Sequence, residues 1–201
     1  MKPIEDLAAL EALYGTPAAP SLRKVADRMT PGYAAWIARA RFCVLGTVGP
    51  EGTDGSPRGD DGPVVRVLDA RTLALPDWHG NNRIDSLRNI VADPRVSLMF
   101  MVAGSTNVVR VNGTAIVTAD GELRAGFARD GKEPRSVIVV TIGEIYFQCA
   151  RAVMRAGLWS GVDQSADLPS PGELLAEMTG GAEGGATYDA DWAPRAARTM
   201  W

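Results

Sequence analysis

Cysteine and histidine are scarce in this sequence, and their scarcity excludes several kinds of site. The 201 residues include two cysteines and one histidine. Cys43 and Cys149 both lie in apolar runs, without the number or spacing of a disulfide framework or a zinc site. His79 alone cannot form a metal site. We therefore expect no metal centre, and favour buried free thiols, typical of a reducing cytoplasm, over a disulfide.

Long hydrophobic runs and an excess of basic charge are also missing. The longest apolar stretch, residues 98–103, is far shorter than the roughly 20 residues that cross a bilayer. Acidic residues follow Met1-Lys2-Pro3-Ile4, where a signal peptide would have its apolar core. With 21 basic and 24 acidic residues, the net charge of −3 does not suit a nucleic-acid binder with a dominant basic surface. We expect a soluble cytoplasmic protein with no membrane or nucleic-acid partner.

Two kinds of catalytic motif are absent as well. No serine, cysteine or carboxylate has the local sequence of a nucleophilic triad, and the glycine-rich segments lack Walker or Rossmann spacing. Apolar residues make up 46% of the chain, which is typical of a folded globular protein. If this protein does chemistry, a cofactor supplies most of it.

The order of the apolar segments predicts a mainly β (α+β) fold. Residues 3–40 have helical spacing, including a helix from Ser21 to Met29. Short strands with intervening turns and one inserted helix follow, which is typical of a small antiparallel barrel or sandwich. Helices are also expected from Thr30-Pro31, with proline at the first helical position, over 122–129, from Ala150 and from Ser170. Glu173, three positions after Ser170, fits a capping box there. We predict one domain in three parts: N-terminal helices packed on the barrel (1–40), the barrel (41–160) and a C-terminal extension (161–201).

Three single residues carry further expectations about the strands and the tail. Pro57 excludes a central ladder position for its strand. Gly113 interrupts a strand and indicates a bulge or a close backbone approach. Trp201 lies in a polar setting near Trp192, which indicates that this tail docks on another surface, such as a second subunit.

The stretch from Pro76 to Ile90 has the strongest chemical signal. A strand, the polar turn Gly80-Asn81-Asn82 and a helix start follow one another, with Arg83 at the helix start. Unpaired backbone amides and a guanidinium there can bind a phosphate. A cation at the positive end of a helix is unfavourable unless an anion lies between them. A capped surface helix with a solvated arginine is the alternative interpretation.

A second basic group lies later in the chain and has a simpler interpretation. Four basic residues fall within a short polar segment: Arg124, Arg129, Lys132 and Arg135. We interpret this group as a solvated loop.

The order of several motifs resembles the pyridoxamine 5'-phosphate oxidase-like, FMN-binding split β-barrel family, over residues 35–160. The motifs are Arg66-Val67-Leu68, Thr72–Pro76, Ser86–Ile90, Asp93–Phe100 and Val109–Gly113. The resemblance implies a split β-barrel of antiparallel strands and a homodimer that holds FMN between its subunits.

The resemblance also implies which residues contact FMN. Asn82, Arg83 and Ser86 would hold the phosphate. Ser56 and Arg58 would lie near the isoalloxazine or ribityl chain, and Pro76 and Asp77 would offer backbone contacts to the ring edge. Arg155 and Trp159 resemble the element that reaches the flavin of the other subunit.

Two departures from the family pattern bear on the substrate. Ser86 stands where vitamin B6 oxidases usually have a lysine, and Val108 where they have a glutamine. The resemblance therefore implies an FMN-dependent oxidoreductase for another small molecule, whose identity the sequence does not give. A non-catalytic flavin-binding barrel that senses or stores the cofactor is one alternative, and a dimeric interaction module without cofactor is another.

Overall fold

The centre of the structure is one antiparallel sheet with the strand order β2-β1-β5-β6-β7-β4-β3. This computed structural model describes residues 1–149 and 151–201. The strands are β1 Phe42–Gly49, β2 Gly52–Gly59, β3 Arg66–Asp69, β4 Thr72–Asp77, β5 Arg95–Met101, β6 Asn107–Thr118 and β7 Ser136–Cys149. The mainly β fold predicted from the sequence is confirmed.

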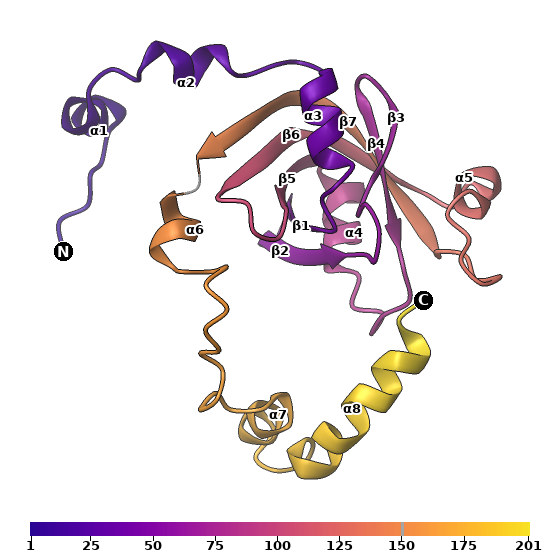
Figure 1. The fold of residues 1–201 in the computed structure, drawn as a ribbon. Helices are drawn as coiled ribbons and strands as arrows, with labels where there is room; N and C mark the ends of the chain where they lie inside the picture. Colours follow the sequence, from indigo (N-terminus) through magenta and orange to yellow (C-terminus); the bar gives the residue numbers. More distant parts are fainter. Residues whose placement is uncertain (150) are drawn as a thin grey trace.

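Helices flank this sheet and form both ends of the chain (Figure 1). They are α1 Leu7–Tyr14, α2 Ala19–Arg23, α3 Pro31–Ile37, α4 Asp85–Ala92, α5 Gly121–Ala125, α6 Arg151–Arg155, α7 Pro171–Met178 and α8 Gly185–Thr199. Within the described residues, no helix has both the length and the apolarity needed to span a bilayer.

The core lies on one face of the curved sheet, because apolar residues alternate along its strands. On β5, Val96, Leu98 and Phe100 are buried while the residues between them are more exposed. β1 follows the same period of two with Cys43 and Leu45. Burying one such large side chain contributes about 1.5–3 kcal/mol. On β1 and β5 the alternation therefore fixes which face of the strand points away from the core.

The sheet curls until β2 and β4, first and sixth in the strand order, face each other. No backbone ladder joins these two strands in the described residues. Side chains join them instead: Arg58 of β2 forms an ion pair with Asp77 of β4 at 2.5 Å. The barrel is thus split between β2 and β4, and this split positions the site described below.

Two sequence-based expectations about the strands are confirmed. β2, which contains Pro57, is an edge strand that pairs only with β1. The register between β6 and β7 shifts at Asn112/Gly113, which is a bulge. A Cβ atom at Gly113 would overlap the carbonyl oxygen of Thr141, so only glycine allows this approach.

Two predicted helices were too long. The helix expected from Ser21 to Met29 ends at Arg23, because the backbone of Ala26 instead exchanges hydrogen bonds of 2.9 and 2.8 Å with Ile145. The helix expected over 122–129 ends at Ala125. Beyond it, Arg129 and Lys132 exchange backbone hydrogen bonds of 2.8 Å across a turn. Both errors come from backbone pairings that local spacing does not reveal.

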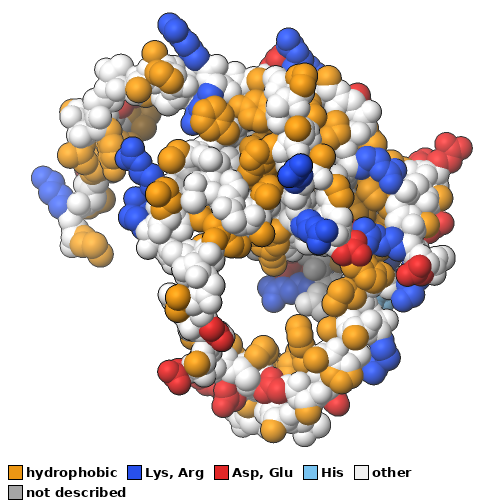
Figure 2. All heavy atoms as spheres, in the orientation of Figure 1, with side chains coloured by type: hydrophobic (Ala, Val, Ile, Leu, Met, Phe, Trp, Pro, Cys, Tyr) orange, Lys and Arg blue, Asp and Glu red, His pale blue; other side chains and the backbone are white. Residues whose placement is uncertain are grey.

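The N-terminal helices differ in whether they contribute buried residues to the core. α1 and α2 contain no buried residue, and their apolar side chains lie on the surface (Figure 2). α3 begins at Pro31 after the Thr30 cap, as expected, and buries Ile37 in the core.

The C-terminal part contains a helix that the sequence did not predict. α8 begins after Gly184 and continues through Pro194, two residues that usually mark breaks. Asp189 of α8 accepts hydrogen bonds from the Ser170 hydroxyl (2.6 Å) and the Gly172 amide (2.8 Å) at the start of α7. The predicted α7 is confirmed, whereas the helix start expected at Ala150 lies outside the described residues.

Candidate functional site

A cavity of about 920 Å³ lies at the split between β2 and the segment that joins β4 to α4. Six of the nine site residues predicted from the sequence line this cavity: Ser56, Arg58, Pro76, Asp77, Asn82 and Arg83. Residues outside those nine also line it, among them Asp60, Trp78, His79, Arg135 and Trp201.

The side chains of β2 reach the cavity because a strand turns alternate residues to opposite faces. Ser56 and Arg58 are partly buried, whereas their strand neighbours Gly55, Pro57 and Gly59 are exposed. The same face of β2 therefore presents a hydroxyl and a guanidinium to the cavity.

Arg58 and Asp77 form the ion pair that bridges the split. Both side chains are largely buried, with 19% and 16% of their surface exposed. The Arg58 Nε group is buried and has no hydrogen-bond partner in the described residues. A buried donor without a partner costs about 1–3 kcal/mol. A ligand acceptor beside Arg58 would remove that cost.

The two cysteines have different surroundings. Cys43 lies opposite Arg58 in the β1–β2 register, and burial raises the pKa of its thiol to about 12, although Arg58 lowers it. Cys43 is thus a neutral, inert core residue. Cys149 is exposed, so the expectation that both thiols are buried was wrong for Cys149. It lies at the end of β7, where the strand has left the core.

The turn before α4 has the geometry of an anion site. Asn82 has a positive φ of 62°, a conformation that asparagine tolerates. No side chain caps the first turn of α4, so its amides stay available to a ligand. Arg83 pairs with Asp85 of that first turn, and this hydrogen bond raises the pKa of Arg83. Asp85 is therefore one anion that compensates Arg83 at the helix start.

Arg135 is the cavity cation that sequence reasoning missed. Its Nη1 donates to Asn82 Oδ1 at 2.6 Å, and its Nη2 lies 3.1 Å from His79 Nδ1. Within the described residues Arg135 forms no ion pair with a carboxylate. Arg135 is exposed in the segment before β7, as expected of a solvated loop. The pairing of β7 with β4 also brings its backbone beside Asp77, at the edge of the cavity.

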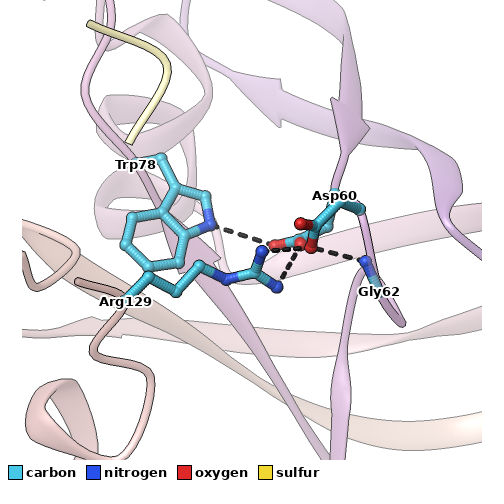
Figure 3. Close-up of polar contacts among 5 residues, drawn as sticks. Asp60, Gly62, Trp78 and Arg129 are labelled. Carbon is cyan, nitrogen blue, oxygen red and sulfur yellow. Dashed lines mark hydrogen bonds and ion pairs between the residues drawn. The ribbon is translucent and has the colours of Figure 1, made fainter.

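A second group of side chains closes another part of the cavity around Asp60 (Figure 3). The Asp60 carboxylate accepts hydrogen bonds from Trp78 Nε1 (3.2 Å), Arg129 Nη2 (2.5 Å) and the Gly62 amide (3.3 Å). Arg129 also pairs with Asp61, and that hydrogen bond raises the pKa of Arg129. Asp60 thus ties the end of β2 to the segments after β4 and after α5.

Replacing Asp60 should cost far more stability than replacing its neighbour Asp61. Asp60 is 4% exposed and satisfies three donors, whereas Asp61 is 70% exposed. We expect Asp60→Ala to lower the free energy of unfolding by about 2–3 kcal/mol. Asp61→Ala, the matched control, should leave it nearly unchanged because exposed pairs contribute little. Urea denaturation of both variants measures the difference, and equal losses would contradict the role given to Asp60.

Trp201 docks on the chain's own cavity. Its ring meets the Trp78 ring edge-on, with centroids 5.4 Å apart at 85°. The Arg129 guanidinium lies 4.6 Å from the Trp201 centroid, which is a cation–π distance. Through these contacts, the C-terminal end of the chain after α8 packs beside the sheet (Figure 1).

The three remaining predicted site residues lie outside the cavity. Ser86 is buried on α4 and donates to Asp54 of β2 at 2.5 Å, so its hydroxyl is already engaged. Arg155 is exposed at the end of α6. Trp159 donates from Nε1 to the Ser105 carbonyl at 2.8 Å. Contact of these three residues with a cofactor stays a prediction.

Comparisons with known proteins point to one family. The sequence model of the family described as pyridoxamine 5'-phosphate oxidase matches residues 29–149, more than half of the chain. No curated protein matches the sequence.

Solved structures also resemble this chain, at low identity. HupZ of Group A Streptococcus is 16% identical with a TM-score of 0.48, over 61% of this chain and 95% of HupZ. A candidate pyridoxamine 5'-phosphate oxidase from Lactobacillus delbrueckii is 22% identical with a TM-score of 0.47, over 60% and 95%. An FMN-binding protein from Syntrophomonas wolfei is 12% identical with a TM-score of 0.43, over 70% and 95%.

Proposed function

The chain belongs to the pyridoxamine 5'-phosphate oxidase family, and from this premise we propose that it binds FMN in the 920 Å³ cavity and acts as an oxidoreductase on a small molecule. One observation carries the proposal. Six residues predicted from the sequence to contact FMN line a single cavity, together with Arg135, a cation without an acidic partner in the described residues.

The phosphate fits the part of the cavity around the start of α4. Arg135 and Arg83 supply guanidinium groups, and Asn82 orients Arg135 through its side-chain oxygen. The uncapped first turn of α4 adds backbone amides, and a helix N-terminus favours negative charge. Arginine suits this role because its planar fork binds two phosphate oxygens at once.

The flavin ring fits the part of the cavity between β2 and β4. Ser56 and Arg58 offer donors from β2, including the buried Arg58 Nε that has no partner in the described residues. Pro76 and Asp77 border the cavity from β4. Bound FMN supplies the transfer of a hydride or of single electrons. Arg58, held by Asp77, would stabilise negative charge that develops beside it.

A homodimer completes this proposal. Arg155 and Trp159 lie outside the cavity of their own chain, which suits a role at the cavity of a partner subunit. The exposed apolar residues of α1 and α2, such as Leu7, Leu13 and Leu22, would be covered in such a dimer. Covering them would stabilise short helices that are marginal alone.

A reduction assay separates the enzyme from a non-catalytic flavin carrier. Protein loaded with FMN is mixed with a nicotinamide reductant and an electron acceptor, and the flavin colour is followed. Repeated bleaching and recovery, with consumption of the reductant, is the result expected of an oxidoreductase. Tight FMN binding without turnover of any reductant or acceptor would contradict the enzymatic part and favour a sensor or storage protein.

A further inference from the structure

A second cavity of about 470 Å³ adjoins the first. The two cavities share Asp60, Pro76 and Trp78 as a common wall. The hydrogen bond from Trp78 to Asp60 holds the indole in that wall (Figure 3). A molecule in the second cavity would therefore lie next to whatever occupies the first.

Most of the second cavity is apolar and several of its walls are flat. Its apolar lining residues are Ala38, Pro63, Val65, Val67, Pro76, Trp78, Phe127 and Ala128. The indole of Trp78 and the phenyl ring of Phe127 present flat surfaces, and aromatic side chains favour edge-on or offset contacts with other rings. Apolar pockets of about 300–1,000 Å³ with a few polar groups are typical small-molecule sites.

Arg66 supplies the one uncompensated charge of the second cavity among the described residues. Its guanidinium lies 4.2 Å from the Phe127 centroid, and its Nη2 donates to the Gly126 carbonyl at 2.5 Å. Neither partner is charged, so the other N–H donors of Arg66 and its full charge remain available. Arg129 lines the same cavity, but Asp60 and Asp61 neutralise it.

The absence of a side chain at Gly126 leaves room for the Arg66 guanidinium. A Cβ atom at position 126 would lie 2.8 Å from Arg66 Nη1, which is too close. The backbone of Gly126 has an ordinary helical conformation with φ −60°, so alanine is allowed there. A Gly126→Ala variant would thus displace the guanidinium without removing its charge.

We propose that the second cavity binds a flat, apolar molecule that carries one carboxylate, with Arg66 binding that carboxylate. The flat apolar walls hold the ring, and the free fork of Arg66 matches a carboxylate geometrically. The cavity shares a wall with the proposed FMN site, so such an aromatic carboxylate is the class of substrate we assign. That last assignment, unlike the binding itself, rests on the proposed function.

Calorimetric titration with 2-naphthoate and its neutral analogue 2-naphthamide tests the proposal. Wild-type protein should bind naphthoate more tightly than naphthamide. Arg66→Gln should lose about tenfold in naphthoate affinity and little in naphthamide affinity. Gly126→Ala should also weaken naphthoate binding. Arg71→Gln is the matched control, because Arg71 is an exposed arginine of the same β3–β4 hairpin as Arg66 and pairs with Asp27. It should leave both affinities unchanged.

Two results would overturn the proposal: no binding of naphthoate to the wild-type protein, or an unchanged preference for naphthoate in Arg66→Gln. Titrations with and without added FMN separate this failure from failure of the proposed function. If the protein binds naphthoate through Arg66 but does not bind FMN, the carboxylate site in the second cavity is supported and the proposed FMN site is refuted. If the protein binds FMN but does not bind naphthoate, the FMN site is supported and the carboxylate site is refuted.

Discussion

Replacing Arg83 and Arg135 together with alanine is expected to lower the affinity for FMN about a hundredfold. Both guanidinium groups lie at the cavity near the uncapped start of α4. Each would make charge-assisted hydrogen bonds with the phosphate, and each such bond to a charged group contributes more than a neutral one. Fluorescence titration of FMN with each variant measures the change.

The effect should be unequal between the two arginines. Arg83 already pairs with Asp85, whereas Arg135 contacts only Asn82 and His79. The single Arg135→Ala variant is therefore expected to account for most of the loss. It should also weaken the salt dependence of FMN binding, because a charge pair is screened by ions.

Arg95→Ala is the matched control for Arg83. Arg95 pairs with Asp93 at a spacing of two residues, as Arg83 does with Asp85. The two arginine side chains are similarly exposed, 72% and 79%. Arg95 does not line the cavity, so its removal should leave FMN affinity unchanged. Equal effects of Arg95→Ala and the double variant would contradict the phosphate assignment.

Gly113→Ala is expected to lower the free energy of unfolding by about 3 kcal/mol or more. The added methyl group would overlap the Thr141 carbonyl and crowd the Gly143 amide at 3.1 Å, both of them backbone atoms that cannot rotate away. The bulge would have to open, which disrupts the pairing of β6 with β7. In a chain of this size the loss corresponds to a melting temperature roughly 6–12 °C lower.

Gly55→Ala is the control for Gly113→Ala. Gly55 also lies in a strand, but a Cβ atom there would meet no atom within 4 Å. Its stability should be unchanged or raised by up to about 1 kcal/mol, because alanine restricts the unfolded chain. Thermal unfolding of both variants gives the comparison. A Gly113→Ala protein as stable as Gly55→Ala would show that the close approach to Thr141 does not exist.

The parts of the fold that could be predicted depend on residues close together in the sequence. The Thr30 cap before Pro31 and the capping box of Ser170 with Glu173 involve neighbours three residues apart. Pro57 and Gly113 act on the backbone at their own positions. Local spacing is enough for such features, and all four were predicted correctly.

The missed parts depend on contacts between distant residues. Ala26 leaves its helix for Ile145, and Arg135 reaches His79 only because β7 pairs with β4. The partners of Asp60, which are Trp78 and Arg129, were not predicted because they lie 18 and 69 residues further along the chain. These pairings exist only once the sheet has curled.

The absorption spectrum of the purified protein, followed by mass identification of any released compound, tests the central claim most directly. We expect the spectrum of an oxidised flavin and the mass of FMN, with one FMN per chain. Colourless protein would contradict it if added FMN also left the melting temperature unchanged, because a ligand that binds the folded state must raise that temperature.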